Sequence, residues 1–171
     1  LCGSEKQRLA LSCLDYSNSM ESFSLVDCAE CGFRFTNPRP TQNSIGRYYS
    51  ADNYISHVNS SGSIQDKLYQ LARKWGLRNK YKMIHRLQPH GKVLDVGCGT
   101  GEFLAHLMSR GYLVQGVEPS LKAREQVVAN HGISVMPTLD LVPAQEQFQV
   151  VTLWHVLEHL PDLRSTFKKL F

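Results

Sequence analysis

The sequence predicts an α/β protein whose sheet is made of parallel strands. Three observations support this fold class. From Lys92 onward, short apolar runs alternate with helical segments through short links, which is typical of right-handed βαβ units. The first of these runs leads into a glycine-rich turn, and a helix follows directly. The hydrophobic fraction of 42% and the charged fraction of 20% are ordinary for a globular protein.

The chain of 171 residues divides into three zones by composition. Residues 1–42 contain four of the five cysteines and end in Asn37-Pro38-Arg39-Pro40, where two prolines interrupt regular structure. Residues 43–90 are aromatic and polar at first and then helical. The predicted helix carries an apolar stripe at helical spacing: Leu68, Leu71, Ala72, Trp75, Tyr81, Ile84 and Leu87. Residues 91–171 hold the strand–helix alternation.

In the third zone we expect about four parallel strands and three helices. The strands are expected at residues 92–96, 112–117, 133–135 and 148–153, and the helices at 102–110, 120–130 and from 162 to the end. Ser120 follows Pro119 and is suited to cap the second helix. The fourth strand is expected to be a bare edge that another copy of the chain could cover in a homodimer. Because the chain starts at Leu1 and ends within a helix, it is interpreted as a fragment.

The net charge of +4 is concentrated in one segment. Residues 64–92 hold eight basic and one acidic side chains, whereas residues 1–63 hold five and six, and residues 93–171 hold six and eight. A solvated helix face is the favoured interpretation of the basic segment, and a nucleic-acid footprint is the alternative. The apolar runs are too short to span a membrane, and no signal peptide is expected.

The strongest motif runs from Asp95 through Gly97, Cys98, Gly99 and Gly101 to Glu102. Glycines between a parallel strand and a helix let a nucleotide-like ligand approach the backbone closely. A dinucleotide site is the competing interpretation, but its sixth position requires a small residue, and here it is Glu102. A carboxylate there would repel a pyrophosphate, so the motif favours a ligand that has no phosphate and carries positive charge. Asp95 is placed to lie beside a positively charged ammonium of such a ligand.

A second acidic residue follows the second predicted strand. Glu118 lies 21 residues after Gly97, where an acidic side chain can accept hydrogen bonds from both hydroxyls of a ribose. The third motif is the segment from Phe148 to Asp162, which ends the fourth strand with Trp154-His155-Val-Leu-Glu-His159. Together the three motifs place polar groups at the carboxyl ends of three strands.

These three motifs resemble the class I S-adenosylmethionine-dependent methyltransferase family over residues 91–171. The resemblance implies a Rossmann-like sheet that is C-terminally truncated here, with further strands beyond Phe171. It implies methyl transfer from S-adenosylmethionine, with an adenine contact near Leu139. The cofactor-binding residues it indicates are Asp95, Gly97, Cys98, Gly99, Gly101, Phe103, Glu118, Pro119, Leu139, Trp154 and His155.

His155 is the candidate catalytic residue, because an acceptor hydroxyl or amine must lose a proton and histidine suits that near neutral pH. His159, four residues later, is interpreted as structural, and a metal site with His155 is the weaker alternative. Trp154 either stacks near the cofactor or fills the core. Tyr54 and His57 are candidates for the acceptor pocket, because in related enzymes such aromatic segments fold over the cofactor as a lid; a surface linker is the alternative.

The cysteines predict a small zinc ribbon in residues 1–42. Cys28-Ala-Glu-Cys31-Gly32 is typical of a zinc knuckle, in which one tight turn supplies two thiolates. Cys2-Gly3 is interpreted as the end of a matching pair whose first cysteine would precede Leu1, and Cys13 is an alternative ligand. A redox pair is a further alternative. The segment also resembles the N-terminal part of some bacterial methyltransferases of the same family.

The predicted function is methyl transfer to a small-molecule or sugar-type acceptor in the cytoplasm, where free cysteines persist. Two alternatives remain open. An RNA methyltransferase would use the cysteine-rich zone and the basic helix to bind its substrate, and its binding would depend strongly on salt. A non-catalytic module would bind S-adenosylmethionine without consuming it.

Overall fold

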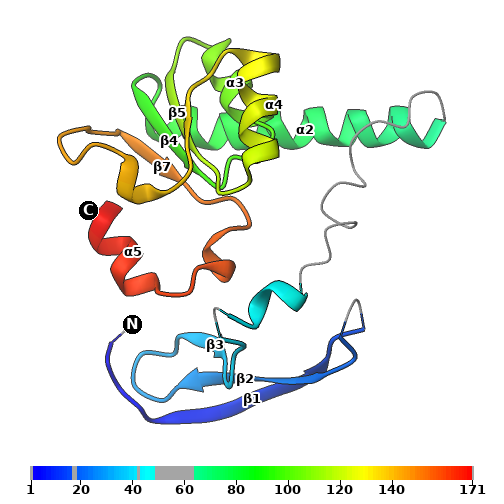
Figure 1. Ribbon diagram of the computed structural model, residues 1–171, viewed down its shortest axis with the longest axis vertical. Helices are drawn as coiled ribbons and strands as arrows, with labels where there is room; N and C mark the ends of the chain where they lie inside the picture. The colour runs from blue at the N-terminus through cyan, green and yellow to red at the C-terminus, as the bar shows by residue number, and fades with distance from the viewer. Residues whose placement is uncertain (1, 17–18, 42, 49–63, 171) are drawn as a thin grey trace. The chain divides into compact units, whose positions relative to one another are not determined.

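The computed structural model describes residues 2–16, 19–41, 43–48 and 64–170 (Figure 1). The chain falls into two compact units, Leu1–Ser61 and Gly62–Phe171. The helix predicted within residues 43–90 belongs to the second unit, together with the whole parallel sheet. Within the described residues, no helix combines the length and the apolar character that crossing a membrane requires.

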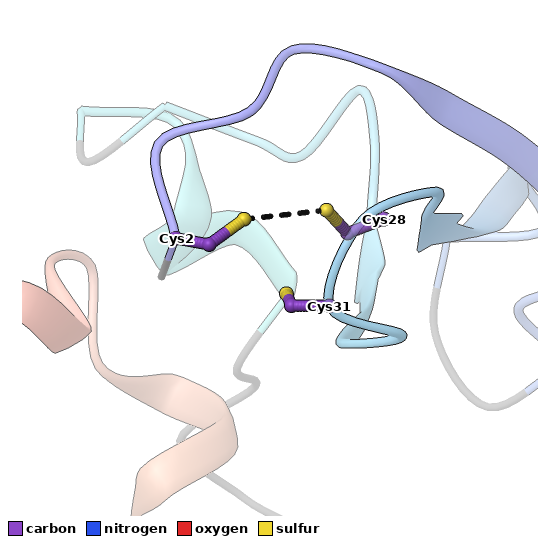
Figure 2. Close-up of side chains that lie close together, drawn as sticks. All are labelled: Cys2, Cys28 and Cys31. Atoms are coloured by element: carbon purple, nitrogen blue, oxygen red, sulfur yellow. Dashed lines mark hydrogen bonds between the residues drawn. The ribbon is translucent and has the colours of Figure 1, made fainter.

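The first unit is built on an antiparallel sheet of three strands in the order β1-β2-β3. The strands are β1 (Gln7–Leu14), β2 (Ser22–Cys28) and β3 (Arg34–Thr36). All eight residues of β1 are exposed, and the buried hydrophobic side chains described in this unit are Val26 and Cys28. The sulfur of Cys28 faces those of Cys2 and Cys31 (Figure 2). The unit is therefore a thin sheet with a very small apolar core.

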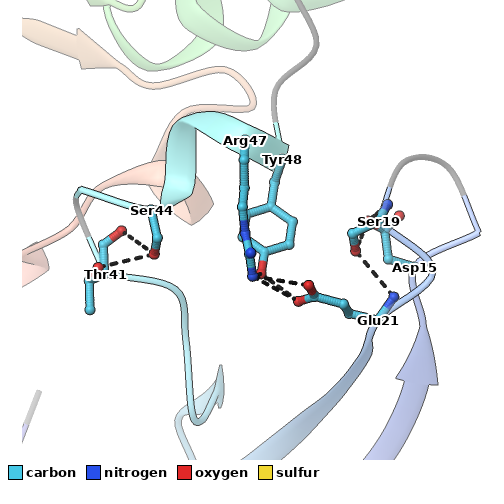
Figure 3. Close-up of polar contacts among 7 residues, drawn as sticks. All are labelled: Asp15, Ser19, Glu21, Thr41, Ser44, Arg47 and Tyr48. Atoms are coloured by element: carbon cyan, nitrogen blue, oxygen red, sulfur yellow. Dashed lines mark hydrogen bonds and ion pairs between the residues drawn. The ribbon is translucent and has the colours of Figure 1, made fainter.

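Polar contacts tie the short helix η1 (Ile45–Tyr48) to the start of β2 (Figure 3). The Arg47 guanidinium donates to Glu21 Oε1 over 3.0 Å, and the Tyr48 hydroxyl donates to Glu21 Oε2. In the β1–β2 turn, the Ser19 hydroxyl and backbone N–H both donate to the Asp15 carboxylate. These exposed contacts order the loops of the first unit, although each contributes little to its stability.

The second unit contains the predicted parallel sheet, with four strands in the order β6-β5-β4-β7. The strands are β4 (Lys92–Val96), β5 (Leu113–Val117), β6 (Val135–Met136) and β7 (Val150–Thr152). The helices are α2 (Ile64–Leu87), α3 (Glu102–Met108), α4 (Leu121–His131) and α5 (Leu163–Leu170). The α/β fold class is confirmed, and Ser120 caps α4 as expected, accepting from the Ala123 N–H.

Two strands are shorter than the apolar runs that predicted them. Ile133 lies before β6 and is buried against Leu104 and Val127, so its apolar side chain serves helix packing rather than a strand ladder. Phe148 similarly precedes β7, and the Lys92 ammonium lies over its ring. Apolar character in these runs reflects burial, which extends beyond the hydrogen-bonded part of each strand.

Alternate residues of β4 face two apolar layers. Val93 packs with Ile84 of α2 and with Phe103 and Leu107 of α3. Leu94 lies in the opposite layer, which includes Leu139, Val151 and Leu170 of α5. Helices thus cover both sides of the sheet, and the carboxyl ends of its strands stay at one edge, where loops and helix starts meet.

The apolar stripe of α2 is only partly buried. Ile84 is 3% exposed, whereas Leu68, Leu71 and Trp75 in the first half of the helix are 68%, 63% and 69% exposed. The prediction of a helix at these residues is confirmed. Only the second half of the helix packs against the sheet, so the apolar residues of its first half and Leu87 stay exposed.

Candidate functional site

The carboxyl ends of β4, β5 and β7 converge on one loop, residues 97–101. The N–H groups of Gly97 and Cys98 both donate to the Val117 carbonyl at the end of β5, over 2.6 and 3.1 Å. The loop therefore folds across the end of β5 before α3 starts. Asp95, near the end of β4, and Glu118, which follows β5, are near enough for their charges to interact.

The three glycines of this loop all have positive φ but differ in what surrounds them. A Cβ at Gly97 would lie 2.3 Å from Val156 Cγ2, and one at Gly101 would lie 2.7 Å from Val127 Cγ1. A Cβ at Gly99, where φ is +55°, would meet nothing within 4 Å. Gly97 and Gly101 are thus required by close packing as well as by the turn. At Gly99 the backbone borders open space that a ligand can use.

Glu118 is buried, with 3% of its surface exposed, and its carboxylate is held by backbone amides. The Gly99 N–H donates to Oε2 over 3.0 Å, and the Ser120 N–H donates to Oε1 over 2.9 Å. Arg124 donates to the main-chain carbonyls of Glu118 and Pro119. These contacts orient a buried negative charge directly beside the open backbone of Gly99.

Asp95 is the second buried carboxylate of the site, at 4% exposure. Its Oδ1 accepts a hydrogen bond of 2.6 Å from the hydroxyl of Thr152, its neighbour on β7. Burial raises the pKa of the Asp95 carboxyl to about 6, although Thr152 and the positive charge of Lys80 both lower it. A cation bound nearby would favour the ionised form of this group.

Lys80 of α2 belongs to this site, and the sequence analysis did not single it out. Its ammonium lies 4.7 Å from the centroid of the Trp154 ring and 5.7 Å from that of Phe103. Burial lowers its pKa, and the negative charge of Asp95 partly restores it. The signal was present in the sequence, because Lys80 falls with Leu77, Tyr81 and Ile84 on the buried stripe of α2.

Trp154 packs its ring edge-on against Phe103, with ring centroids 5.9 Å apart. Its indole Nε1 is buried and has no hydrogen-bond partner within the part of the chain that the structure describes. A buried donor of this kind is costly unless it finds an acceptor. Trp154 thus packs in the core and also leaves a donor for an additional group.

His155 follows directly and has a backbone φ of +57°, a conformation uncommon for residues other than glycine. Its side chain is 87% exposed, and Nδ1 lies 3.9 Å from Glu158 Oε1. Because the helix η3 (Leu157–His159) begins only after His155, the two histidines do not share one helical face. The shared helical turn on which the alternative of a metal site at His155 and His159 depends is therefore not formed.

The remaining predicted positions have different surroundings. Leu139, in the helix η2 (Leu139–Leu141), packs against the layer of Leu94, Val96 and Val117. Burial raises the pKa of the Cys98 thiol to about 12, so this side chain stays a neutral thiol at neutral pH. Tyr54 and His57 lie outside the described residues.

The cysteine cluster is in the first unit. The sulfurs of Cys2, Cys28 and Cys31 lie within 4.8 Å of one another. Cys13 is not among them: it pairs with Phe23 in the β1–β2 ladder, six residues along β1 from Gln7, the partner of Cys28. That separation is about 20 Å along a strand, so the alternative of Cys13 as a ligand beside Cys28 and Cys31 is wrong.

Among known proteins, the family match falls within the second unit of the chain. A family model described as a methyltransferase domain matches residues 64–171. The ubiquinone biosynthesis O-methyltransferase of Yersinia enterocolitica is 30% identical over 141 residues, which cover 68% of this chain and 58% of that protein. The corresponding enzyme of Acinetobacter baylyi is 29% identical and is covered to 58%. The chain therefore spans little more than half the length of these curated relatives.

Two solved structures share the fold. The magnesium protoporphyrin IX methyltransferase of Synechocystis, solved with bound S-adenosylmethionine, aligns with a TM-score of 0.52 at 18% identity over 73% of this chain and 67% of its own. An amino pentose methyltransferase from Micromonospora echinaspora aligns with a TM-score of 0.51 at 20% identity over 66% of this chain and 52% of its own. At these identities the likeness concerns the fold.

Proposed function

Because the chain belongs to the methyltransferase-domain family, we propose that it binds S-adenosylmethionine at the carboxyl ends of β4, β5 and β7 and transfers its methyl group to a small-molecule acceptor. The observation that carries this proposal is the open backbone of Gly99, which donates to the buried Glu118 carboxylate in the loop that follows the buried Asp95. Such a site suits a cationic nucleoside and disfavours a pyrophosphate, which these charges would repel.

The charges of the site match the two ends of the cofactor. Its amino-acid end carries an ammonium and a carboxylate, and we assign the ammonium to Asp95 and the carboxylate to Lys80. Lys80 and Asp95 are coupled electrostatically, so a zwitterion between them would satisfy both. Glu118 is assigned to the ribose hydroxyls and Leu139 to the adenine, with Gly97, Cys98, Gly101, Phe103 and Pro119 shaping the wall around them.

Methyl transfer is an in-line displacement in which an acceptor oxygen or nitrogen forms the new bond to carbon. When bound, the cofactor supplies an activated methyl group and leaves as a neutral thioether. The protein must position the acceptor and accept its proton. We propose His155 for the proton, because its exposed imidazole lies three residues after the carboxyl end of β7 and Glu158 at 3.9 Å can stabilise the imidazolium.

The acceptor belongs to the class of small molecules, including sugar-type metabolites. The support is that the chain resembles O-methyltransferases of ubiquinone biosynthesis in sequence and an amino pentose methyltransferase in fold. Tyr54 and His57 stay proposals for the acceptor pocket. We also propose a cytoplasmic location, with β7, an edge strand of the described sheet, as the surface that a homodimer would cover.

Calorimetric titration with S-adenosylmethionine, S-adenosylhomocysteine and NAD tests the cofactor assignment. We expect the two nucleoside thioethers to bind with a stoichiometry of one and NAD to show no binding. Binding of NAD alone would overturn the proposal. Production of S-adenosylhomocysteine in the presence of a phenolic or sugar acceptor then separates an enzyme from a module that binds the cofactor without consuming it.

Replacement of Lys80 tests the assignment of the amino-acid end. We expect Lys80→Met to weaken S-adenosylmethionine binding about tenfold, about 1.4 kcal/mol, because the cofactor carboxylate loses a charged partner. Lys80→Arg should retain most of the affinity. The measurement is calorimetry with S-adenosylmethionine and with 5′-methylthioadenosine, which lacks the amino-acid group and should bind all three proteins equally.

Lys82→Met is the matched control, because Lys82 lies two residues away on α2 with an exposed side chain. It removes the same charge from the same helix and should leave both affinities unchanged. Equal losses in Lys80→Met and Lys82→Met would assign the effect to net charge and would contradict a direct role of Lys80.

A further inference from the structure

We infer that Cys2, Cys28 and Cys31 form a site for one Zn²⁺ ion in the first unit, separate from the methyltransferase site. The three sulfurs come from two segments far apart in the sequence and point toward a common centre (Figure 2). The Cys2 and Cys28 sulfurs are 3.6 Å apart. A tetrahedral zinc ion with bonds of about 2.3 Å to sulfur places its thiolates about 3.8 Å apart, so little movement is needed to bind it.

The turn that carries Cys28 and Cys31 is already folded in a way that suits a metal. The Gly32 N–H donates to the Cys28 carbonyl over 3.0 Å, and the Cys28 N–H donates to the Phe33 carbonyl over 2.9 Å. Gly32 has a φ of +71°, which lets the chain reverse directly after Cys31. These backbone contacts hold the Cys28–Cys31 turn in its folded form before a metal binds.

The arm that carries Cys2 is held against the same turn. The Ala29 N–H donates to the Lys6 carbonyl over 2.9 Å, and the Lys6 ammonium lies 3.3 Å from the Glu30 carboxylate. Cys2 therefore reaches the other two sulfurs through an ordered backbone. Among the described residues, Cys2, Cys28 and Cys31 are the one group of three or more side chains placed to share a metal ion.

Zinc fits this donor set better than magnesium, calcium or a disulfide. Three thiolates are soft ligands, which select zinc over magnesium or calcium. Three sulfurs converge here, whereas a disulfide uses two. On binding, each thiol gives up its proton to solvent and forms a bond to zinc, with no change in oxidation state. The fourth position of the tetrahedron takes water or another donor.

The first unit has a physical need for such a link. Its described buried hydrophobic side chains are Val26 and Cys28, and β1 is exposed along its whole length. A domain with so small a core usually requires a metal or a disulfide to fold. A zinc ion would join the arm before β1 to the turn between β2 and β3 and so close the sheet at one end.

Metal analysis and cobalt titration of the full chain test this inference. The protein purified without chelator should contain one zinc ion per chain. Metal-free, reduced protein should take up one Co²⁺ with intense tetrahedral bands and a thiolate charge-transfer band, and Zn²⁺ should displace it. Failure to take up either ion, or bands typical of octahedral oxygen ligands, would overturn the inference.

Serine variants identify the ligands, and Cys13→Ser is the matched control because Cys13 is an exposed cysteine of the same sheet. Cys2→Ser and Cys31→Ser change exposed side chains, so the sheet should still form. Each should weaken Co²⁺ binding at least about 100-fold, more than the loss of a supporting residue causes. Cys13→Ser should bind unchanged. An equal loss in Cys13→Ser, or a Cys2–Cys28 disulfide in protein purified under reducing conditions, would refute the site.

Discussion

The affinity for S-adenosylmethionine should increase as the pH rises through about 6, the pKa to which burial raises the Asp95 carboxyl. Below this pH the carboxyl is protonated and cannot pair with the ammonium of the cofactor. Above it the carboxylate is ionised, and the affinity should level off. The ligand therefore binds with release of a proton at acidic pH. Calorimetry in buffers of different ionisation enthalpy measures both the affinity and the number of protons released.

Asp95→Asn should lower the affinity about 30-fold at neutral pH, about 2 kcal/mol, because it removes a charge-assisted hydrogen bond. It should also remove the rise in affinity near pH 6. Binding of 5′-methylthioadenosine should change much less, since that ligand has no ammonium. Glu125→Gln, at an exposed carboxylate of α4, is the control. A profile for Asp95→Asn that still rises near pH 6 would assign the titration to another group.

The Asp95 carboxyl should make the stability of the ligand-free protein fall as the pH rises, whereas it makes the cofactor affinity rise. Its pKa in the folded protein, about 6, lies above the ordinary value of 3.8 that applies to the unfolded chain. Its contribution to stability is therefore fully present below the ordinary value and is lost as the pH rises through about 6. The ligand-free protein thus holds an ionised, buried carboxylate at neutral pH at some cost, and cofactor binding offsets that cost.

Much of the second unit could be predicted because local and long-range signals agree there. The apolar run at residues 92–96, the glycines after it and the cap at Ser120 each determine one element, and the parallel sheet follows from their order. The strand ends were less predictable. Ile133 and Phe148 are apolar because they pack against helices and neighbouring side chains, and only the three-dimensional structure distinguishes that burial from strand pairing.

Of the charged residues of the site, Asp95 and Glu118 were predicted from the sequence and Lys80 was not. Asp95 and Glu118 lie beside a recognisable turn, so their sequence position indicates their place in space. Lys80 lies on a helix that precedes the motif, and its role depends on which face of α2 packs against α3 and Trp154. The surplus of basic residues on α2 favours a solvated helix face. One of them instead lies half-buried over two aromatic rings.

In the cysteine zone, residues 1–42, the sequence predicts two of the metal ligands but leaves the third open. The Cys28–Cys31 spacing alone predicts a pair of ligands, but the third could have been Cys2 or Cys13 by sequence. The antiparallel register of β1 with β2 decides between them, because it pairs Gln7, not Cys13, with Cys28. Register depends on pairing between residues distant in sequence, which spacing within one segment does not reveal.

The largest loss of stability is expected from Gly97→Ala. Its Cβ would lie 2.3 Å from Val156 Cγ2, and φ at this residue is +72°. Overpacking and left-handed backbone strain together should lower the free energy of unfolding by about 2–4 kcal/mol. Cofactor binding should be lost with the displaced loop. Denaturant unfolding and calorimetry measure the two effects, and Val156→Ala in the same protein should restore part of the stability because it removes the clashing methyl groups.

Gly99→Ala should separate binding from stability at a neighbouring position. Its Cβ would meet nothing within 4 Å, so only the positive φ opposes it, at about 1–2 kcal/mol. Gly111→Ala is the matched control, because Gly111 has a φ of +85° and equally open surroundings but lies in the turn between α3 and β5, outside residues 97–101. Both variants should lose similar stability, and only Gly99→Ala should lose about tenfold or more in affinity for S-adenosylmethionine. If Gly99→Ala binds the cofactor as well as Gly111→Ala does, the open space at Gly99 is not the place where the ligand lies.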